Sequence, residues 1–393
     1  MASTTAQGGR HVDVARPGAE QRRQQLSAAA ARLFHRYGFH QVSLANVANA
    51  VGITAPAVYR HFRNKHALLA GAIESGLEVV DTAFDEADEP LECLVAGLAG
   101  AALERRDLWT LLQRELRHLN GEERVKLQAR FDDFVSRCSA RVRTARPDLD
   151  RGELALVVTA MLATLASPSM GVVNMPRPAY QGWLTRAAVA VARTTMPHSD
   201  QGTPAASAQH DHADTSLTRS EQLLRTAIDL FHEHGYAAVS LDDIGAAVGL
   251  AGPSIYHHFT TKSELLEAAF SDAAHRLETS HGNHDGTVSL DELARSYIQL
   301  GVQQRQLFGV YVNEAINLPP RARRHITSEL SANIDLWVNA LRLRRPELEV
   351  SSSRVLVYAA RAIVNDVVRV GHLHTRSQIV AELDRLVHAV LNA

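Results

Sequence analysis

The sequence has few cysteines and no long apolar run. Its 393 residues contain two cysteines, Cys93 and Cys138, too few for a disulfide framework or a cysteine-rich metal site. No segment reaches the ~18 consecutive apolar residues of a membrane-spanning helix, and residues 1–20 lack the apolar core of a signal peptide. Nucleophile-elbow, P-loop and dinucleotide-binding motifs are missing from suitable contexts. We therefore expect a cytoplasmic protein with reduced thiols and no catalytic residue, cofactor or metal.

What is present is a helical pattern with enough apolar content for real cores. Hydrophobic residues make up 46% of the chain, and the net charge is −2. Apolar residues recur one helical turn apart, as in Leu26, Ala30 and Leu33, and long amphipathic runs cover 154–165 and 355–370. The alternation typical of β-strands is missing. The pattern predicts an all-α fold with two domains or more.

The chain is also a duplication. Residues 25–69 and 222–266 align without a gap at an offset of 197, and 20 of their 45 positions are identical. Beyond this segment the match continues at an offset of 199: residues 146–149 (RPDL) correspond to 345–348 (RPEL). Two residues therefore entered the second copy between Leu266 and Leu307, and the loop 281–286 is the natural place. Head and body are both repeated.

The repeat sets the expected domain boundaries. Residues 194–218 are rich in Ser, Thr, Gln and His and lack apolar periodicity, as is typical of a flexible linker. We predict a disordered tail, head 1, body 1, linker, head 2 and body 2, over residues 1–20, 21–69, 70–197, 198–217, 218–266 and 267–393.

Each head has the pattern of a helix-turn-helix. In head 1, Gly38 ends one helix, Ser43 is placed to cap the next, and Gly52 stops it where a left-handed residue is needed. Thr54 can then cap a second short helix that contains Pro56 in its first turn. Two short helices joined by a glycine turn form a helix-turn-helix, whose second helix enters the major groove.

Head 2 repeats this pattern with one loss. Ser240 and Asp243 form a start like a capping box, Gly249 makes the turn and Pro253 opens the second helix. Ala251 stands where Thr54 stands, so the second helix loses a side-chain cap.

The residues of the two heads resemble the TetR/AcrR repressors, in a form with two heads in one chain. The resemblance is carried by residues 33–39, 44–52, 57–62 and 65–69 in head 1, and by 235–236, 254–259 and 262–266 in head 2. It implies two units, each a three-helix head followed by a helical body that binds a ligand and dimerises. The residues it assigns to DNA contact are Arg22, Arg23, Ser43, Thr54, Ala55, Ala57, Tyr59, Arg60, His61, Lys65, Ser240, Ala251, Gly252, Ser254, Tyr256, His257, His258 and Lys262. Packing of Tyr59 and Tyr256 against their own heads remains an alternative.

The charges of the two heads differ. Residues 21–66 contain seven basic residues and no acidic one, a net charge of +7, whereas residues 218–263 contain three basic and five acidic residues, a net charge of −2. A basic head inside a nearly neutral chain is a typical electrostatic footprint for phosphate. We therefore expect head 1 to contribute more to DNA affinity.

The bodies offer apolar faces and a few polar candidates. In TetR-like proteins the last two helices of each body build a four-helix interface, and here residues 153–166 with 180–192 and 354–370 with 377–391 can supply it from one chain. Ligand pockets between helices are mostly apolar with a few polar groups. The candidates are Trp109, Leu112, Gln113, Glu115, Phe308, Tyr311 and Glu314, with core packing as the alternative for the aromatic residues and structural hydrogen bonding for the glutamates.

The leading hypothesis is a transcriptional repressor that works as an intramolecular pseudo-dimer. A small apolar or lipid-like effector would release it from a non-palindromic double-stranded DNA operator. The alternative is an effector-independent DNA-binding scaffold that acts through protein contacts; an enzyme is the third and least supported hypothesis. The sequence names neither the operator, the effector nor the regulated genes.

Overall fold

The computed structural model describes residues 18–87, 90–197, 218–250, 252–279 and 288–393. All regular elements in these ranges are helices, which confirms the all-α prediction. The predicted linker, Ala251 and the loop 281–286 lie outside the described residues, as does most of the predicted tail. The first helix begins at Ala19, two residues inside the predicted tail.

Copy 1 forms a small head followed by a longer body. The head consists of α1 (Ala19–Tyr37), α2 (Leu44–Ala50) and α3 (Ala55–Val58). The body comprises α4 (Lys65–Asp85), α5 (Leu91–Glu104), α6 (Leu108–Thr110), the π-helical turn η1 (Leu111–Glu115), the 3-10 turn η2 (Leu116–His118), α7 (Gly121–Ala145), α8 (Arg151–Ala166), the 3-10 turn η3 (Ser167–Ser169) and α9 (Arg177–Arg193).

Copy 2 repeats the order. Its head consists of α10 (Arg219–His234), α11 (Leu241–Ala247) and α12 (Gly252–Ile255). Its body comprises α13 (Lys262–Thr279), α14 (Leu290–Gln303), α15 (Arg305–Glu314), the 3-10 turn η4 (Ala315–Asn317), α16 (Pro320–Arg344), α17 (Val350–Val367), the 3-10 turn η5 (Leu373–Thr375) and α18 (Ile379–Leu391).

The helix bounds refine two sequence predictions. α5 and α14 begin 199 residues apart, so the two extra residues of copy 2 precede α14. α4 and α13 run unbroken across the predicted head–body boundaries after Leu69 and Leu266. Head and body are therefore joined rigidly by one helix in each copy, and no loop separates them.

The described residues form three apolar cores. One lies in head 1 and extends to α4 and α6, and a second lies in head 2 and extends to α13, α15 and α16. The third is continuous through both bodies, so the two copies share one core. Its centre is formed by α8 and α9 of copy 1 against α17 and α18 of copy 2.

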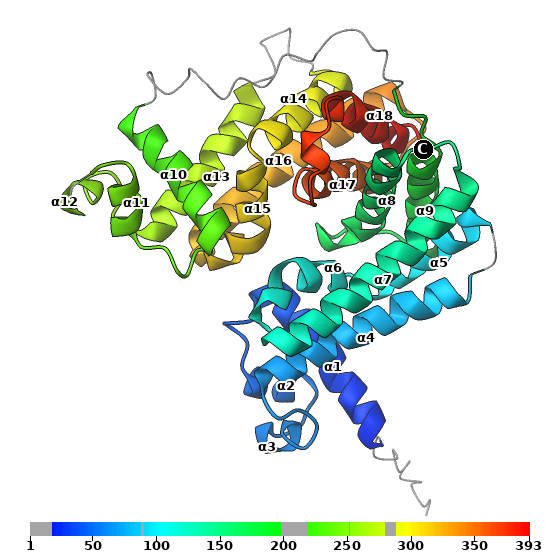
Figure 1. The fold of residues 1–393 in the computed structure, drawn as a ribbon, viewed down its shortest axis with the longest axis horizontal. Coiled ribbons are helices and arrows are strands. Elements are labelled where there is room, and N and C mark those ends of the chain that lie inside the picture. The colour runs from blue at the N-terminus through cyan, green and yellow to red at the C-terminus, as the bar shows by residue number, and fades with distance from the viewer. Residues whose placement is uncertain (1–17, 88–89, 198–217, 251, 280–287) are drawn as a thin grey trace, which may run out of the picture.

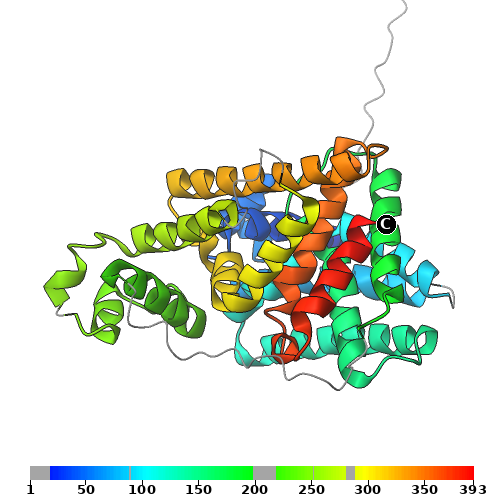
Figure 2. The ribbon, with the colours of Figure 1, turned by 90° about the horizontal axis from the view of Figure 1, so that it is seen from above.

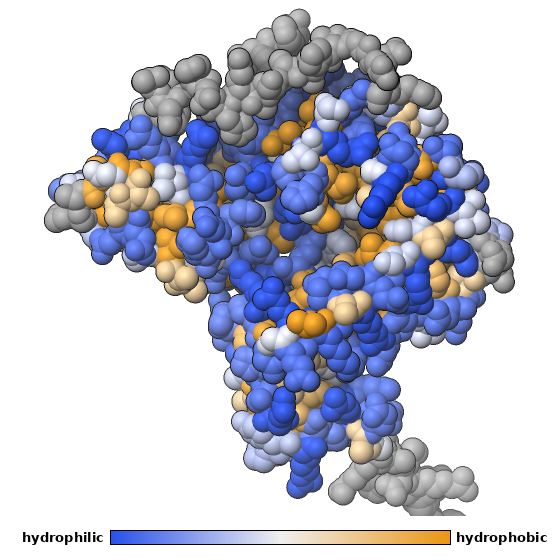
Figure 3. Space-filling view, in the orientation of Figure 1, coloured by the Kyte–Doolittle hydropathy of each residue, from blue (hydrophilic) through white to orange (hydrophobic). Residues whose placement is uncertain are grey.

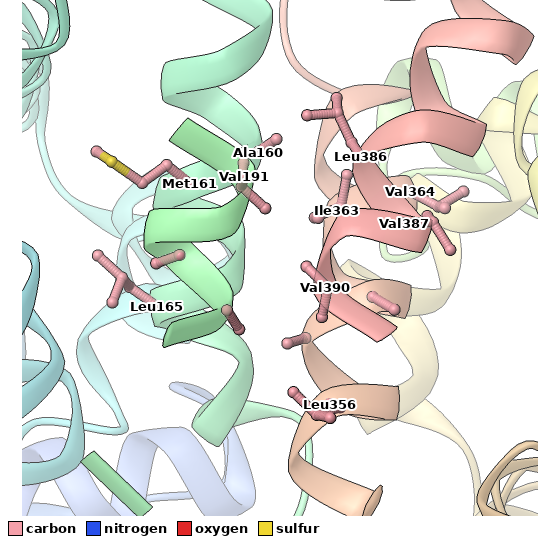
Figure 4. Packing of buried hydrophobic residues seen from close by; sticks show 14 of the residues in the cluster. Ala160, Met161, Leu165, Val191, Leu356, Ile363, Val364, Leu386, Val387 and Val390 are labelled. Atoms are coloured by element: carbon pink, nitrogen blue, oxygen red, sulfur yellow. The ribbon is translucent and has the colours of Figure 1, made fainter. Parts of the chain in front are cut away.

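Figure 4 shows this centre at close range. Met161 and Leu165 on α8 and Val191 on α9 lie on one side, and Leu356, Ile363 and Val390 lie on the facing helices α17 and α18. α8 with the turn after it (Arg151–Ser169) is long and apolar enough to cross a membrane, yet most of it is buried in this packing. It is therefore a core helix of the bundle.

The two heads occupy separate corners of the molecule. In Figure 1, α1–α3 project at the bottom and α10–α12 at the left, and the helices α8, α9, α17 and α18 of the shared core lie at the upper right. Figure 2, seen from above, again places α10–α12 at one end of the long axis. Figure 3 shows mainly hydrophilic residues over head 1, as expected for a surface exposed to water.

Candidate functional site

The predicted helix-turn-helix is present in head 1. The Ser43 hydroxyl accepts a hydrogen bond from the backbone N–H of Asn46 at 3.1 Å, and the Asn46 side chain accepts one from Ser43 N at 2.8 Å. This reciprocal capping box fixes the start of α2. Gly52 then turns the chain with a φ of +70°, a conformation that favours glycine.

Head 2 is built by the same contacts. Ser240 and Asp243 form the same reciprocal capping box at the start of α11, and Gly249 makes the turn with a φ of +72°. Thr54 differs from expectation, since it occupies the N-cap of α3 without a side-chain hydrogen bond. The threonine therefore adds no side-chain cap, and the prediction that it does so was wrong.

The second helix of each motif presents its end to solvent. Tyr59 is 58% exposed and Tyr256 is 48% exposed, so packing inside the heads is not their role. Thr54 and Arg60 are exposed in head 1, and His257 is exposed in head 2. The structure also exposes His258 and leaves Ala55, Ala57, His61 and Ser254 half-buried at these surfaces.

Lys65 and Lys262, predicted to contact DNA, bind backbone carbonyls of their own heads. The Lys65 ammonium donates to the carbonyl oxygen of Phe39 at 2.9 Å and lies 4.2 Å from the centre of its ring. Lys262 donates to the carbonyl oxygens of Tyr236 and Val239. Burial lowers the pKa of both lysines. These side chains tie the first residues of α4 and α13 to the turn before α2 and α11, which is a structural role inside each head.

Other predicted contact residues are also engaged within head 1. Arg23 donates to the carbonyl oxygen of His61 at 2.8 Å and lies 4.4 Å from the Phe62 ring centre. Arg22 donates to Gln25. Arg23 is exposed at the surface and Arg22 is half-buried. Several of the seven basic residues of head 1 are therefore engaged in contacts within copy 1, as Arg23, Lys65 and Arg63 show.

A cavity of about 550 Å³ lies between the copies. Copy 1 contributes residues of η1 and α8, and copy 2 contributes residues of α13, α14, α15, α16 and α17. Its size falls within the ~300–1,000 Å³ of small-molecule sites, and its walls are mostly apolar. An effector site in at least one body stays a prediction, and this large cavity is lined by residues of both copies.

Four of the seven predicted ligand residues line this cavity: Trp109, Gln113, Phe308 and Tyr311. Burial raises the pKa of Tyr311 to about 12, so its hydroxyl stays protonated. Leu112 lines a separate, smaller space of about 60 Å³ in body 1. Glu115 and Glu314 line neither of these two spaces, and their role in ligand binding stays a prediction.

Glu115 holds head 1 by hydrogen bonding, and Glu314 accepts hydrogen bonds from Arg117 and Asn317. Glu115 accepts the backbone N–H of Phe39 at 3.1 Å and is paired with Arg114. Arg114 also donates to the carbonyl oxygens of Phe34 and His35 at the end of α1. This is the structural hydrogen bonding left open as an alternative for these residues.

The sequence prediction missed the polar group at the opposite wall of the cavity. Asp366 on α17 accepts hydrogen bonds from Trp109 Nε1 at 2.9 Å and from Gln113 at 3.1 Å, and it pairs with Arg369. Arg361, one turn earlier on the same helix, also lines the cavity. Charged residues inside the apolar run 355–370 were the available signal. In the described ranges, no cluster of three or more His, Cys, Asp or Glu is placed to hold a metal.

Comparison with known proteins finds the same unit twice. The model of bacterial regulatory proteins of the tetR family matches residues 26–72 and 223–269. The HTH-type transcriptional repressor KstR2 of Rhodococcus jostii is 28% identical over 129 residues, which is 31% of this chain and 63% of that protein. The HTH-type transcriptional regulator TtgR of Pseudomonas putida is 36% identical over 103 residues, 26% of this chain and 45% of that protein.

Solved structures of the same kind cover less than half of the chain. The ketosteroid transcriptional regulator KstR2 of Mycobacterium tuberculosis matches 44% of this chain and 94% of its own, with 20% identity and a TM-score of 0.39. The curated relatives named above align over 63% and 45% of their own lengths, less than two thirds in each case. Both halves of the chain therefore contain the helix-turn-helix region of the tetR family of bacterial regulatory proteins, in a tandem TetR-like arrangement.

Proposed function

We propose that this protein is a sequence-specific transcriptional repressor that binds one asymmetric DNA operator with its two heads. The observation that carries the proposal is a pair of unlike helix-turn-helix motifs held on one shared core. α3 and α12 each enter the major groove of one half-site. Regulators and repressors among the relatives support this function.

The two recognition helices differ at exposed and half-buried positions. Arg60 of head 1 corresponds to His257 of head 2, and Ala57 corresponds to Ser254. Symmetric dimers read palindromes because their recognition helices are identical. Two unlike helices therefore select two unlike half-sites.

The cavity supplies the route from an effector to the heads. His35 at the end of α1 and Arg114 of η1 both line it, and Arg114 donates to the backbone of α1. A molecule that separates η1 from α17 therefore displaces head 1 relative to head 2. An effector that binds the displaced state better weakens DNA binding by its differential affinity, and DNA weakens the effector equally.

Selection from a random duplex library tests the function and its asymmetry together. We expect an enriched sequence with two different half-sites about one helical turn apart, bound by one chain as judged by light scattering of the complex. An Arg60→Ala variant should relax selection in one half-site and leave the other unchanged. Enrichment of perfect inverted repeats, or no enrichment at all, would refute the proposal.

A further inference from the structure

Arg361 is a buried charge with no acidic partner. Arg361 is only 4% exposed. Every other buried Asp, Glu or Arg in the described ranges has an ion-pair partner: Arg105 with Asp107, Arg114 with Glu115, Arg117 with Glu314, Arg369 with Asp366, and Arg376 with Glu382. Burying an unpaired charge costs free energy, so the position of Arg361 in the cavity wall needs an explanation.

The contacts of Arg361 leave hydrogen-bond donors in excess. Its guanidinium donates to the Asn333 side-chain oxygen and lies 4.1 Å from the centre of the Tyr297 ring. Arg361 Nε and Asn333 Nδ2 are buried without an acceptor in the described structure. Both atoms are donors, so the group that completes them must bring acceptor atoms.

The repeat shows that this polar group is specific to copy 2. At the offset of 199, Asn333 and Arg361 correspond to Phe134 and Leu162 of copy 1. In copy 1, Phe134 packs against Phe131, and the equivalent space shrinks to about 60 Å³. Copy 2 therefore has an open cavity that contains the Arg361 cation. In copy 1 the apolar side chains of Phe134 and Leu162 take the equivalent positions.

The other charges of the cavity set the sign and number of charges on the ligand. Asp366 already accepts from Trp109 and Gln113 and is neutralised by Arg369, and Arg114 is neutralised by Glu115. Arg361 alone remains uncompensated, which leaves one positive charge. Guanidinium binds carboxylate through two parallel hydrogen bonds, and a dianionic phosphate would call for a second free cation.

The remaining walls suit an apolar body. They include Leu277, Leu300, Leu307, Phe308, Leu330 and Ile334. We propose that this cavity binds one small aliphatic or aromatic monocarboxylate per chain, with Arg361 as its counter-ion. The inference rests on the proposed function, because it assigns the chemical class of the effector.

Binding is measured on the full chain without DNA, by titration calorimetry. The probes are hexanoate, decanoate and 4-phenylbutyrate, each paired with its neutral amide, together with decyl phosphate. We expect at least one carboxylate to bind with a stoichiometry of one per chain and at least tenfold more tightly than its amide. Arg361→Leu, which installs the residue of copy 1, should abolish that preference, and Arg361→Lys should retain part of it.

Two controls separate the site from the fold. Arg321→Leu removes an exposed arginine from α16, a helix that also lines the cavity, and should leave binding unchanged. Arg361→Leu should raise the Tm of the ligand-free protein by a few degrees, since it removes an unpaired buried charge. A lower Tm would show that Arg361 is a structural residue and would overturn the proposal.

Further outcomes also decide the question. Equal affinity for acid and amide, unchanged affinity in Arg361→Leu, tighter binding of decyl phosphate, or no binding of any carboxylate would each overturn the carboxylate assignment. DNA binding by the same preparation is measured in parallel. Intact DNA binding with no carboxylate binding refutes this inference alone, whereas loss of sequence-specific DNA binding refutes the proposed function.

Discussion

Arg117 of copy 1 reaches across to copy 2 and donates to the Glu314 carboxylate at 2.7 Å. Ile316, the residue that corresponds to Arg117 in the repeat, reaches the opposite way and lies against Gly38 in head 1. Glu314 also stands beside Gly235 of head 2, as Glu115 stands beside Gly38. Arg117 and Ile316 occupy equivalent positions in the two copies. Each therefore contacts the other copy close to that copy's head.

Arg117→Ala should destabilise the fold, because the Glu314 side chain is only 3% exposed and would lose its cation. We expect the free energy of unfolding, measured in urea, to fall by about 2–3 kcal/mol. This is near the low end for breaking a buried ion pair, because Arg117 is partly exposed. Arg63→Ala is the matched control, since its pair with Glu123 lies at the surface and should cost less than about 0.5 kcal/mol. Adding Glu314→Gln should recover part of the loss; no recovery would mean that the charge of Glu314 is not the cause.

Gly38→Ala should cost more than Gly52→Ala. Both residues have a positive φ, +78° and +70°, so both substitutions introduce backbone strain of about 1–3 kcal/mol. An added Cβ at Gly38 would also meet Ile316 at 3.1 Å, whereas at Gly52 it would meet nothing within 4 Å. Thermal unfolding of Gly38→Ala alone and combined with Ile316→Ala measures the cross-copy part. Equal effects of the two glycine substitutions would contradict this contact.

Stability should fall as pH drops below neutrality because of His118. Burial, and next the nearby Arg117, lower the pKa of His118 from 6.5 to about 4. The folded protein thus holds the ring neutral while the unfolded chain takes up a proton. This stability is complete above pH 6.5 and is lost as pH falls from 6.5 towards 4.

Between pH 7.5 and pH 5 we expect the free energy of unfolding to fall by roughly 1–2 kcal/mol because of His118. Urea unfolding at the two values, on the native chain and on His118→Gln, measures it. The variant should lose this part of the pH dependence, whereas His40→Gln, which changes the exposed ring beside His118, should keep it. An identical pH profile for His118→Gln would show that other groups cause the loss.

Head 1 should dominate the salt dependence of DNA binding. Arg60→Ala should lower the slope of log affinity against log salt by about 0.9, the contribution of one phosphate contact, and His257→Ala should lower it less. These exposed residues are the appropriate pair, because Lys65 and Lys262 hold their own heads together. Fluorescence anisotropy at several salt concentrations gives both slopes. A larger effect of His257→Ala would mean that head 2 carries most of the phosphate contacts.

Local patterns were enough to predict the heads. The capping serines, Gly52 and Gly249 act within a few residues, so the duplication and the helix-turn-helix could be derived from the sequence. The inward direction of Lys65 could not, because a lysine at the first position of a helix looks the same whether it binds phosphate or a backbone carbonyl. A count of charged residues therefore includes Lys65 among the surface charges, whichever of the two groups it binds.

The cavity was harder to predict because its walls come from both copies. Trp109 and Asp366 are 257 positions apart, and no local periodicity brings them together. Glu115 and Glu314 were singled out correctly as equivalent positions, but the pattern did not tell a head support from a ligand contact. Aligning the two copies position by position was the signal for Arg361, since a leucine stands at 162.

The shared core of α8, α9, α17 and α18 has a kinetic consequence. In a homodimer the equivalent helices meet in a bimolecular step, so the population of the assembled form falls on dilution. Here both halves belong to one chain, and their docking is a first-order event. The fraction of competent molecules is then the same at a few copies per cell as at high expression. Under the proposed function, the covalent link between the two copies makes the response to an effector independent of the abundance of the protein.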